Sequence, residues 1–396
     1  MNDVLAATLV APGELELRRY PYPQQIEPGA VLLRMLASGI CGTDKHTFRG
    51  ETEQYAGTDH ARTTPFPIIQ GHENVGVVEE IGAGGALASD GTPLRVGDRV
   101  VPAPNWSCGA CASCLRGFPY YLCRQLENYG NSLTSERPPH LFGGWAEYLY
   151  LLPGTPIFRV PAELPLEVAV LTELFAVTHS LELAARLPRP AGFYPGDAVA
   201  VVGVGPVGVV HAAKAALMGA ARVIAVDRHS FRLDLAADVG ATDCILADED
   251  GAETAARIRA LSGGGVDVVV DATGVPETFL PCVDAVRDGG TLIEVGAFVD
   301  LGPVAFNPAV LCGRNLTLLG VGGEDARAYP GALALLARHH ERVPFAHLVT
   351  HRFPLTEAVE AMQVALEANA TIKVVVEPAP DAKAPGRQPP SQNHLD

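Results

Sequence analysis

A glycine-rich turn directly follows a short apolar segment in the middle of this chain. Residues 198–202 are all apolar, and the next six read Gly-Val-Gly-Pro-Val-Gly. In a strand–turn–helix unit the first glycine allows the tight turn, the second lets a pyrophosphate approach the backbone, and the third lets the helix pack on the strand. The expected helix, 207–218, would offer free N–H groups to phosphate at its start. We therefore expect a dinucleotide to contact Gly203, Gly205, Pro206, Val207 and Gly208.

Strand-like and helix-like segments alternate after this turn. Further apolar segments at 222–226, 266–270 and 291–295 are separated by helical patterns. Continuous apolar strands with helices between them indicate a parallel, doubly wound sheet that is covered on both faces. Asp227 follows the segment at 222–226, 19 residues after Gly208, where a carboxylate would accept hydrogen bonds from an adenosine ribose and disfavour a 2′-phosphate. This favours NAD over NADP, although the adjacent Arg228 could accommodate that phosphate.

The first 160 residues follow a different pattern. Short β-rich segments at 31–36, 74–81, 99–102 and 146–152 are separated by glycine and proline, which predicts a β-barrel-like or irregular all-β domain. A chain of 396 residues is long enough for two domains. Residues 51–67 are polar and rich in turn-forming residues, and we interpret them as a loop that covers the substrate.

Four of the eight cysteines lie close together, at Cys108, Cys111, Cys114 and Cys123. The N-terminus has no basic stretch followed by an apolar run, so we expect no secretory signal and a cytoplasmic protein, in which clustered cysteines bind metal rather than form disulfides. Four thiolates give zinc a closed tetrahedral site, which is structural rather than catalytic. An iron–sulfur cluster and a set of reduced packing cysteines are the alternatives.

A second group of metal-binding side chains precedes the cysteine cluster. Cys41 begins the segment Cys-Gly-Thr-Asp-Lys-His at 41–46, and His72 and Glu73 stand at the start of an apolar segment. A thiolate, an imidazole and a carboxylate can supply three zinc ligands and leave one position free. Such an open site is typical of catalytic zinc.

Five motifs place this chain beside one enzyme family. They are the segment at 41–46, Gly-His-Glu at 71–73, the cysteine loop at 108–123, Gly-Gly-Trp-Ala-Glu-Tyr at 143–148 and the glycine turn at 203–208. In these motifs and their order the chain resembles the zinc-containing medium-chain dehydrogenases, which include alcohol, sorbitol and threonine dehydrogenases. The resemblance covers residues 5–376. It implies an α/β protein with a GroES-like β-rich catalytic domain at 1–175, a Rossmann NAD-binding domain at 176–322, a return to the catalytic domain at 323–377 and a disordered tail at 378–396.

The resemblance also implies a ligand set for the catalytic zinc. Cys41 and His72 would bind the ion, with Glu73 a direct or exchangeable ligand. Glu173 stands at the position of the remaining ligand, where glutamate is the pattern of the polyol and threonine branch of the family. Asp44 would hydrogen-bond His72 and fix the orientation of its ring.

Two further side chains of the 41–46 segment have implied roles in proton transfer. Thr43 would contact the substrate oxygen, and His46 would complete a proton relay to solvent. The zinc ion would act as a Lewis acid on the alcohol or carbonyl. The expected reaction is hydride transfer between NAD and a secondary or polyol-type alcohol or its ketone, with one catalytic and one structural zinc per chain.

The net charge of the chain limits the classes of partner that it can bind. The formal net charge of -16 disfavours nucleic acids and anionic membrane surfaces, so we expect a small-molecule substrate and, from the resemblance, a homodimer or homotetramer. Two alternative functions stay open at this point. One is a zinc-free quinone or enoyl reductase of the same fold, and the other is a non-catalytic sensor that binds zinc and a nucleotide.

Overall fold

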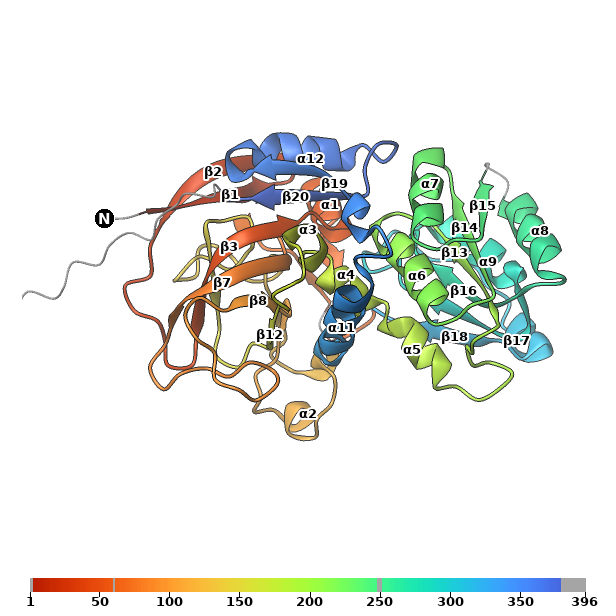
Figure 1. Ribbon diagram of the computed structural model, residues 1–396, viewed down its shortest axis with the longest axis horizontal. Helices are drawn as coiled ribbons and strands as arrows, with labels where there is room; N and C mark the ends of the chain where they lie inside the picture. The colour runs from red at the N-terminus through yellow and green to blue at the C-terminus, as the bar shows by residue number, and fades with distance from the viewer. Residues whose placement is uncertain (1–2, 60, 248–250, 379–396) are drawn as a thin grey trace, which may run out of the picture.

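The computed structural model describes residues 3–59, 61–247 and 251–378, and Figure 1 shows two lobes that lie side by side. One lobe is built from mainly antiparallel sheets, with one parallel pair, β19 (Val349–Pro354) and β20 (Lys373–Glu377), and contains both the first and the last described strands. We call it the β-rich lobe. The other, the parallel-sheet lobe, is formed by the middle of the chain. The predicted fold class is therefore confirmed.

The β-rich lobe is organised around one seven-stranded sheet. Its strands run in the order β12-β8-β7-β3-β20-β19, with β11 also paired to β3. The bounds are β3 Val31–Gly39, β7 Glu73–Ile81, β8 Arg99–Pro102, β11 Tyr148–Leu151, β12 Ile157–Arg159, β19 Val349–Pro354 and β20 Lys373–Glu377. Strand β3 is apolar along most of its length and buried, because its side chains pack into hydrophobic clusters. The last described strand, β20, pairs with β3 and thus brings residues 373–377 back to the β-rich lobe.

Smaller sheets complete this lobe. One sheet contains β1 (Asp3–Ala11), β2 (Glu14–Pro21) and β6 (Ile68–Ile69), and two hairpin-like pairs contain β4 (Glu53–Gln54) with β5 (Arg62–Thr63) and β9 (Asn105–Trp106) with β10 (Glu127–Asn128). The segment 51–67, predicted as a loop, contains the short strand pair of β4 and β5, and its predicted role in covering the substrate stays a prediction. Gln54 also bridges to Val299 of the parallel-sheet lobe, so this segment contacts both lobes.

The parallel-sheet lobe has six strands in the order β15-β14-β13-β16-β17-β18. Their bounds are β13 Ala198–Val202, β14 Arg222–Asp227, β15 Asp243–Leu246, β16 Val266–Asp271, β17 Val286–Glu294 and β18 Thr317–Gly320. The helices that cover this sheet are α6 Pro206–Leu217, α7 Ser230–Asp238, α8 Gly251–Ser262, α9 Phe279–Ala285 and α10 Ala309–Arg314. This strand order reverses at β13, which is where a doubly wound sheet opens a crevice for a dinucleotide.

Helices between the lobes tie them together. They include α3 (Leu166–Ala169), α4 (Thr172–Val177), α5 (His179–Ala185) and α11 (Tyr329–His339), while α1 (Gly42–Phe48), α2 (Ala112–Leu115) and α12 (Ala358–Leu366) belong to the β-rich lobe. Short 3-10 turns occur at Tyr120–Leu122, Pro276–Thr278, Ala326–Ala328, Phe345–Leu348 and Leu355–Glu357. One hydrophobic cluster runs from Phe158 through Leu174 to Val201 and so crosses the boundary between the lobes.

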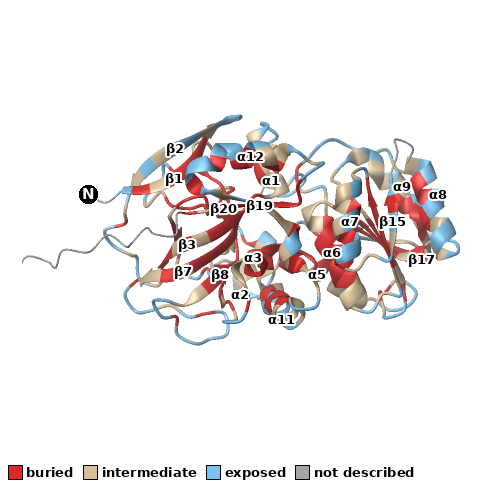
Figure 2. Cartoon of the chain, turned by 45° about the horizontal axis from the view of Figure 1, so that its top comes forward, coloured by how far each residue is buried: buried red, intermediate tan, exposed pale blue. Residues whose placement is uncertain are grey.

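Burial follows this architecture (Figure 2), with the sheets and the inter-lobe helices forming the core. The stretch Leu166–Ala185 is apolar and long enough to cross a bilayer by composition, but it is 78% buried inside the protein. Strands β19 and β20 return to the β-rich sheet after the parallel sheet. The residue limits of the domains stay a prediction, and the tail predicted at 378–396 lies outside the described residues except for Pro378.

Candidate functional site

The structure brings Cys41, His72 and Glu73 together. Cys41 is the N-terminal cap of α1, and Glu73 is the first residue of β7, next to His72. One potential ligand atom from each of the three residues lies within 4.8 Å of the other two. His72 and Glu73 are buried, and Cys41 is half-buried. A thiol, an imidazole and a carboxyl group held this close fit three of the four ligands that a zinc ion takes.

Asp44 holds two members of this group in place. Its Oδ2 accepts a hydrogen bond from the Cys41 backbone N–H at 2.8 Å, and its Oδ1 lies 3.6 Å from Nδ1 of His72. Burial lowers the pKa of His72, but the negative charges of Asp44 and Cys41 outweigh it and raise that pKa well above its usual value. Asp44 therefore lies where the sequence predicts an orienting partner for His72.

Glu173 lies in the first turn of α4 and is buried. It is not among the three residues whose ligand atoms lie within 4.8 Å of one another. Its Oε2 is buried and finds no hydrogen-bond partner within the described ranges. Burial and the nearby charge of Glu73 raise the pKa of Glu173 well above its usual value. A buried carboxyl oxygen without a partner is costly unless something binds it, and a metal ion beside Cys41 and His72 would fill that need.

Lys373 is a residue of this site that the sequence interpretation missed. Its Nζ lies 2.6 Å from Oε1 of Glu73 and donates to the carbonyl of Ile40 at 3.0 Å, and both charged side chains are fully buried. Burial lowers the pKa of Lys373, but the charges of Glu73 and Cys41 raise it overall. The available signal was a single lysine at the start of the apolar segment 373–376, because a charge inside a buried strand requires an opposite charge.

Thr43 and His46 stand on α1, the helix that Cys41 caps. Both are half-buried. Nδ1 of His46 lies 2.5 Å from Oε2 of Glu51, and both of these side chains are partly exposed. The arrangement gives His46 a carboxylate partner at the surface, which suits a group that exchanges protons with water.

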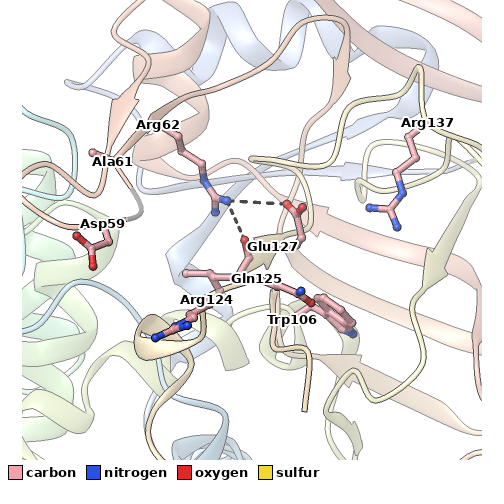
Figure 3. Close-up of a pocket in the computed structure, with 9 residues that line it drawn as sticks. Asp59, Ala61, Arg62, Trp106, Arg124, Gln125, Glu127 and Arg137 are labelled. Atoms are coloured by element: carbon pink, nitrogen blue, oxygen red, sulfur yellow. Dashed lines mark hydrogen bonds and ion pairs between the residues drawn. The ribbon is translucent and has the colours of Figure 1, made fainter. Parts of the chain in front are cut away.

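A cavity of about 530 Å³ opens in the β-rich lobe beside β5, β9 and β10 (Figure 3). It is lined by Asp59, Ala61, Arg62, Trp106, Arg124, Gln125, Leu126, Glu127 and Arg137. Arg62 donates to the carbonyl of Leu126 at 2.9 Å and lies 3.9 Å from Glu127. Trp106 lines this cavity and also packs against the core of the lobe.

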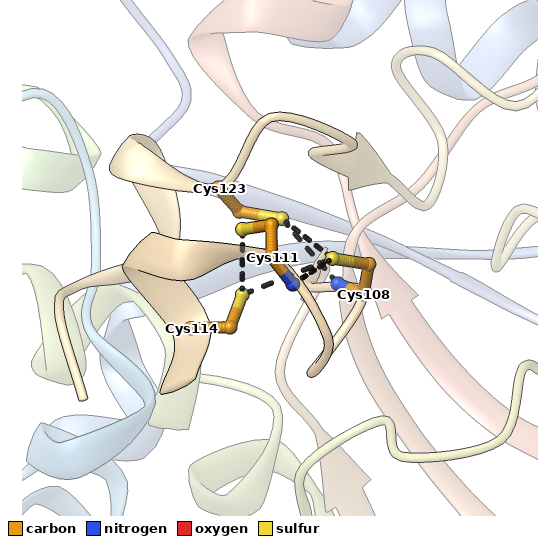
Figure 4. Close-up of side chains that lie close together, drawn as sticks. All are labelled: Cys108, Cys111, Cys114 and Cys123. Atoms are coloured by element: carbon orange, nitrogen blue, oxygen red, sulfur yellow. Dashed lines mark hydrogen bonds between the residues drawn. The ribbon is translucent and has the colours of Figure 1, made fainter. Parts of the chain in front are cut away.

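The four clustered cysteines converge on one point (Figure 4). Neighbouring sulfur atoms lie 3.5 Å (Cys111 to Cys114), 3.6 Å (Cys108 to Cys123) and 4.0 Å (Cys108 to Cys114) apart. A zinc ion bonded to four sulfurs at about 2.3 Å separates them by roughly 3.8 Å in a regular tetrahedron. Backbone N–H groups of Cys114 and Arg124 also lower the pKa of Cys111 to about 6, which favours the thiolate. The geometry fits a closed zinc site.

Replacing Cys123, the buried member of this set, by serine tests the structural role. We expect the zinc content to fall by about one ion per chain and the free energy of unfolding to fall by at least about 2 kcal/mol, because bound metal stabilises only the folded loop. Metal analysis and chemical denaturation measure the two effects. Cys312→Ser at an exposed cysteine is the control, and equal zinc content in the two variants would contradict the assignment.

The glycine turn has the geometry expected of a dinucleotide-binding loop. Gly203 has a φ of +82°, and a side chain at Gly208 would meet the carbonyl of Gly203 at 1.8 Å. Asp227 ends β14, and its carboxylate accepts hydrogen bonds from the backbone of Val204 and His229, each at 3.0 Å. The turn and the acidic residue are therefore adjacent.

Two cations near this turn were not identified from sequence. Arg232, in the first turn of α7, lies 3.6 Å from Asp227, whereas Arg228 is exposed. The guanidinium of Arg232 is the nearest group to Gly205, at 3.5 Å from the place where a Cβ would stand. Lys45 on α1 is the second: burial and the positive charges of Lys373 and Arg232 lower its pKa to about 8. Neither cation carries a local motif that would reveal it.

Comparison with known proteins identifies the family to which this chain belongs. Two family profiles match the chain, that of the alcohol dehydrogenase GroES-like domain over residues 27–162 and that of zinc-binding dehydrogenases over residues 206–338. The chain is 31% identical to 5-exo-hydroxycamphor dehydrogenase of Pseudomonas putida, across 95% of this chain and 99% of that protein. It is 30% identical to sorbitol dehydrogenase of Bacillus subtilis, across 95% and 98%.

Solved structures agree with the sequence relatives. The crystal structure of an alcohol dehydrogenase from Thermotoga maritima superposes with a TM-score of 0.84 at 28% identity, covering 96% of this chain and 100% of that one. The match thus includes both lobes. Identity of this level along nearly the whole chain, together with the two matching profiles, shows that the chain belongs to the zinc-containing medium-chain dehydrogenases, the family of alcohol and polyol dehydrogenases.

Proposed function

We propose that this protein transfers hydride between a secondary or polyol-type alcohol, or the matching ketone, and NAD. The observation that carries the proposal is the open metal group of Cys41, His72 and Glu73, with the unpartnered Glu173 beside it. A zinc-free reductase would have no use for these buried ligand atoms. The closed site at Cys108–Cys123 stabilises the lobe and takes no part in the reaction.

The residues around the open metal group have different roles in the proposed reaction. A zinc ion bound there would supply Lewis-acid polarisation of the substrate oxygen. Thr43 accepts the proton of the alcohol, and His46 passes it to solvent beside Glu51, with which it is already in contact. Asp44 acts through His72, whose ring it orients. The buried surroundings of His72 and Glu73 keep water away from the hydride path.

Metal content and activity together test this function. Zinc-replete protein should contain about two zinc ions per chain and should reduce NAD in the presence of secondary alcohols or polyols, with absorbance of the reduced nicotinamide as the readout. About one ion per chain with quinone or enoyl reduction would favour the zinc-free reductase. Cofactor binding without turnover of any alcohol, ketone, quinone or enoyl compound would favour the sensor.

The cofactor is held, in this proposal, by the glycine turn and the charges around it. The N–H groups at the start of α6 face the pyrophosphate, and Asp227 accepts the adenosine ribose hydroxyls, which favours NAD. Lys45 adds a cation that has no hydrogen-bond or ion-pair partner among the described side chains. Lys45 and Arg232 are close enough for their charges to repel each other. An anion bound between the lobes would offset this repulsion.

Lys45→Met should weaken binding of NADH by about tenfold, because it removes one charge-assisted contact to the pyrophosphate. Fluorescence titration of the purified protein measures the dissociation constant. Arg49→Met, which removes an exposed cation from the end of the same helix, is the matched control and should change the affinity by less than about threefold. Equal affinities for wild type and Lys45→Met would remove Lys45 from the cofactor site.

We further propose a homodimer or homotetramer in the cytoplasm, on the pattern of the family. Light scattering of the purified protein tests the assembly.

A further inference from the structure

A buried acidic side chain, Glu324, lies where the chain leaves the parallel sheet. It follows β18 by four residues and is 4% exposed. The carboxyl ends of parallel strands face the crevice in which doubly wound proteins bind their ligands. Across the boundary between the lobes, Nδ2 of Asn105 on β9 donates a hydrogen bond to Oε1 of Glu324 at 2.6 Å. Glu324 is therefore placed at the crevice and is held from the β-rich lobe.

Glu324 has no cation to balance it. Within residues 3–59, 61–247 and 251–378, no lysine, arginine or histidine lies within ion-pair distance of its carboxyl group. Burial raises the pKa of Glu324 to about 7, and the charge of His72 acts against that rise. The carboxyl group is thus electrostatically close to the open metal group. A buried acid that lies at the crevice, with a pKa this far from its usual value, is a candidate for recognising a ligand, and its carboxyl group can accept a hydrogen bond in addition to that from Asn105.

Polar groups continue outward from Glu324 toward the cavity of Figure 3. Asn105 also contacts Asn128 on β10, and Asn128 donates to the hydroxyl of Tyr55 at 3.2 Å. Arg62, a wall of the cavity in Figure 3, contacts the side-chain oxygen of Asn128. The negative charge of Glu324 helps to raise the pKa of Tyr55 to about 12, although burial is the larger cause. These side chains therefore form one connected polar wall beside Glu324.

The chemistry of this wall suits hydroxyl groups. Amides and phenols donate and accept hydrogen bonds, and a carboxyl group accepts them strongly. A pocket for a simple alkyl alcohol would be lined with apolar side chains, because an alkyl group makes no hydrogen bonds with a polar wall. The names of the two relatives, which refer to hydroxycamphor and to sorbitol, include an apolar alcohol and a polyol, so relationship alone does not decide between these substrate classes.

We propose that Glu324, held by Asn105, determines substrate specificity by accepting a hydrogen bond from a hydroxyl group adjacent to the one that is oxidised, so that the substrate is a vicinal diol or polyol. This inference rests on the proposed function. Glu324 takes no part in the hydride transfer itself. It positions the substrate, and the Asn105 contact positions Glu324.

A matched pair of substrates isolates the second hydroxyl group. 2-Butanol and 2,3-butanediol present the same type of secondary alcohol with and without a hydroxyl neighbour. We expect wild type to have a kcat/KM for the diol at least about 100-fold above that for 2-butanol. Glu324→Gln should lower the value for the diol by roughly 10- to 100-fold and that for 2-butanol by less than about threefold. Glu341→Gln, at an exposed position, should change neither.

Three results would overturn the proposal. Equal losses on both substrates would show a general structural role, and a wild-type preference for 2-butanol would show an apolar pocket. Preference for 3-amino-2-butanol that is lost in Glu324→Gln would assign the carboxylate to an ammonium group instead. Unfolding temperatures of both variants show whether the fold is intact.

Failure of the proposed function can be told apart from failure of this inference. If zinc-replete protein oxidises no alcohol, the proposed function fails, and calorimetric titration of 2,3-butanediol into the NAD complex still tests Glu324. Binding by wild type that is lost in Glu324→Gln supports recognition of the diol by this residue. Binding that is absent, or equal in both proteins, contradicts it.

Discussion

Replacing Cys41 by serine should reduce kcat/KM for the alcohol substrate by about 10³-fold or more while leaving the fold intact. The expected size follows from the loss of Lewis-acid stabilisation worth several kcal/mol, since each 1.36 kcal/mol is a factor of ten in rate. Cys41 caps α1 in a capping box with Asp44 and is only half-buried, and serine is a favoured residue at such a cap, so serine is accommodated in its place. Steady-state kinetics on the zinc-replete variant give the measurement.

The metal content of this variant separates the two sites. Cys41→Ser should retain about one zinc ion per chain, held by the four clustered cysteines, whereas wild type binds about two. Cys244→Ser, at an exposed cysteine of the parallel-sheet lobe, controls for loss of a thiol and should keep both ions and full activity. A Cys41→Ser protein with wild-type kinetics would refute the metal-dependent mechanism.

Replacing Lys373 by methionine should lower the free energy of unfolding by about 3–5 kcal/mol, because it leaves the Glu73 carboxylate buried without its partner. Both side chains of this pair are fully buried and 2.6 Å apart, so water cannot replace the lost charge. Methionine has a similar length and fills the space, which limits any packing defect. Urea denaturation at constant zinc concentration, followed by tryptophan fluorescence, measures the change.

Two variants control this experiment. Lys373→Arg keeps the charge and should retain most of the stability. Lys214→Met breaks the pair with Glu182, in which the glutamate is 38% exposed, and should cost less than about 1 kcal/mol because water solvates that carboxylate. A loss in Lys373→Met no larger than that in Lys214→Met would show that the buried pair adds nothing to stability.

Local features of this protein could be predicted from its sequence. The helix predicted at 207–218 is α6, Pro206–Leu217, because its start depends on the glycine turn immediately before it. The four cysteines converge as their spacing predicts, because a loop of this length closes on one ion with little freedom to do otherwise. In both cases the determining residues are close in the chain.

Contacts between distant segments could not be predicted in this way. Asn105 and Glu324 are 219 residues apart, and Glu73 and Lys373 are 300 apart. Neither pair has a spacing rule that connects its members. Arg232, four residues after Arg228, lies 3.6 Å from Asp227 because α7 turns it back toward the glycine turn, whereas Arg228 is exposed; the role of Arg228 toward a 2′-phosphate stays a prediction. Arg228 is adjacent to Asp227 in sequence, but the guanidinium close to the Asp227 carboxylate belongs to Arg232.

The pairing of β20 with β3 has a consequence for how this protein is made. Glu73 leaves the ribosome 300 residues before Lys373, which at usual elongation rates is a delay of roughly 15–60 s. During that time the nascent β-rich lobe contains an acid without its lysine partner, and the end of β3 at Ser38 and Gly39 lacks the strand β20 that pairs with it. The lobe that begins synthesis first therefore finishes folding last, and a chain cut short before β20 would present that open edge to chaperones or to other chains.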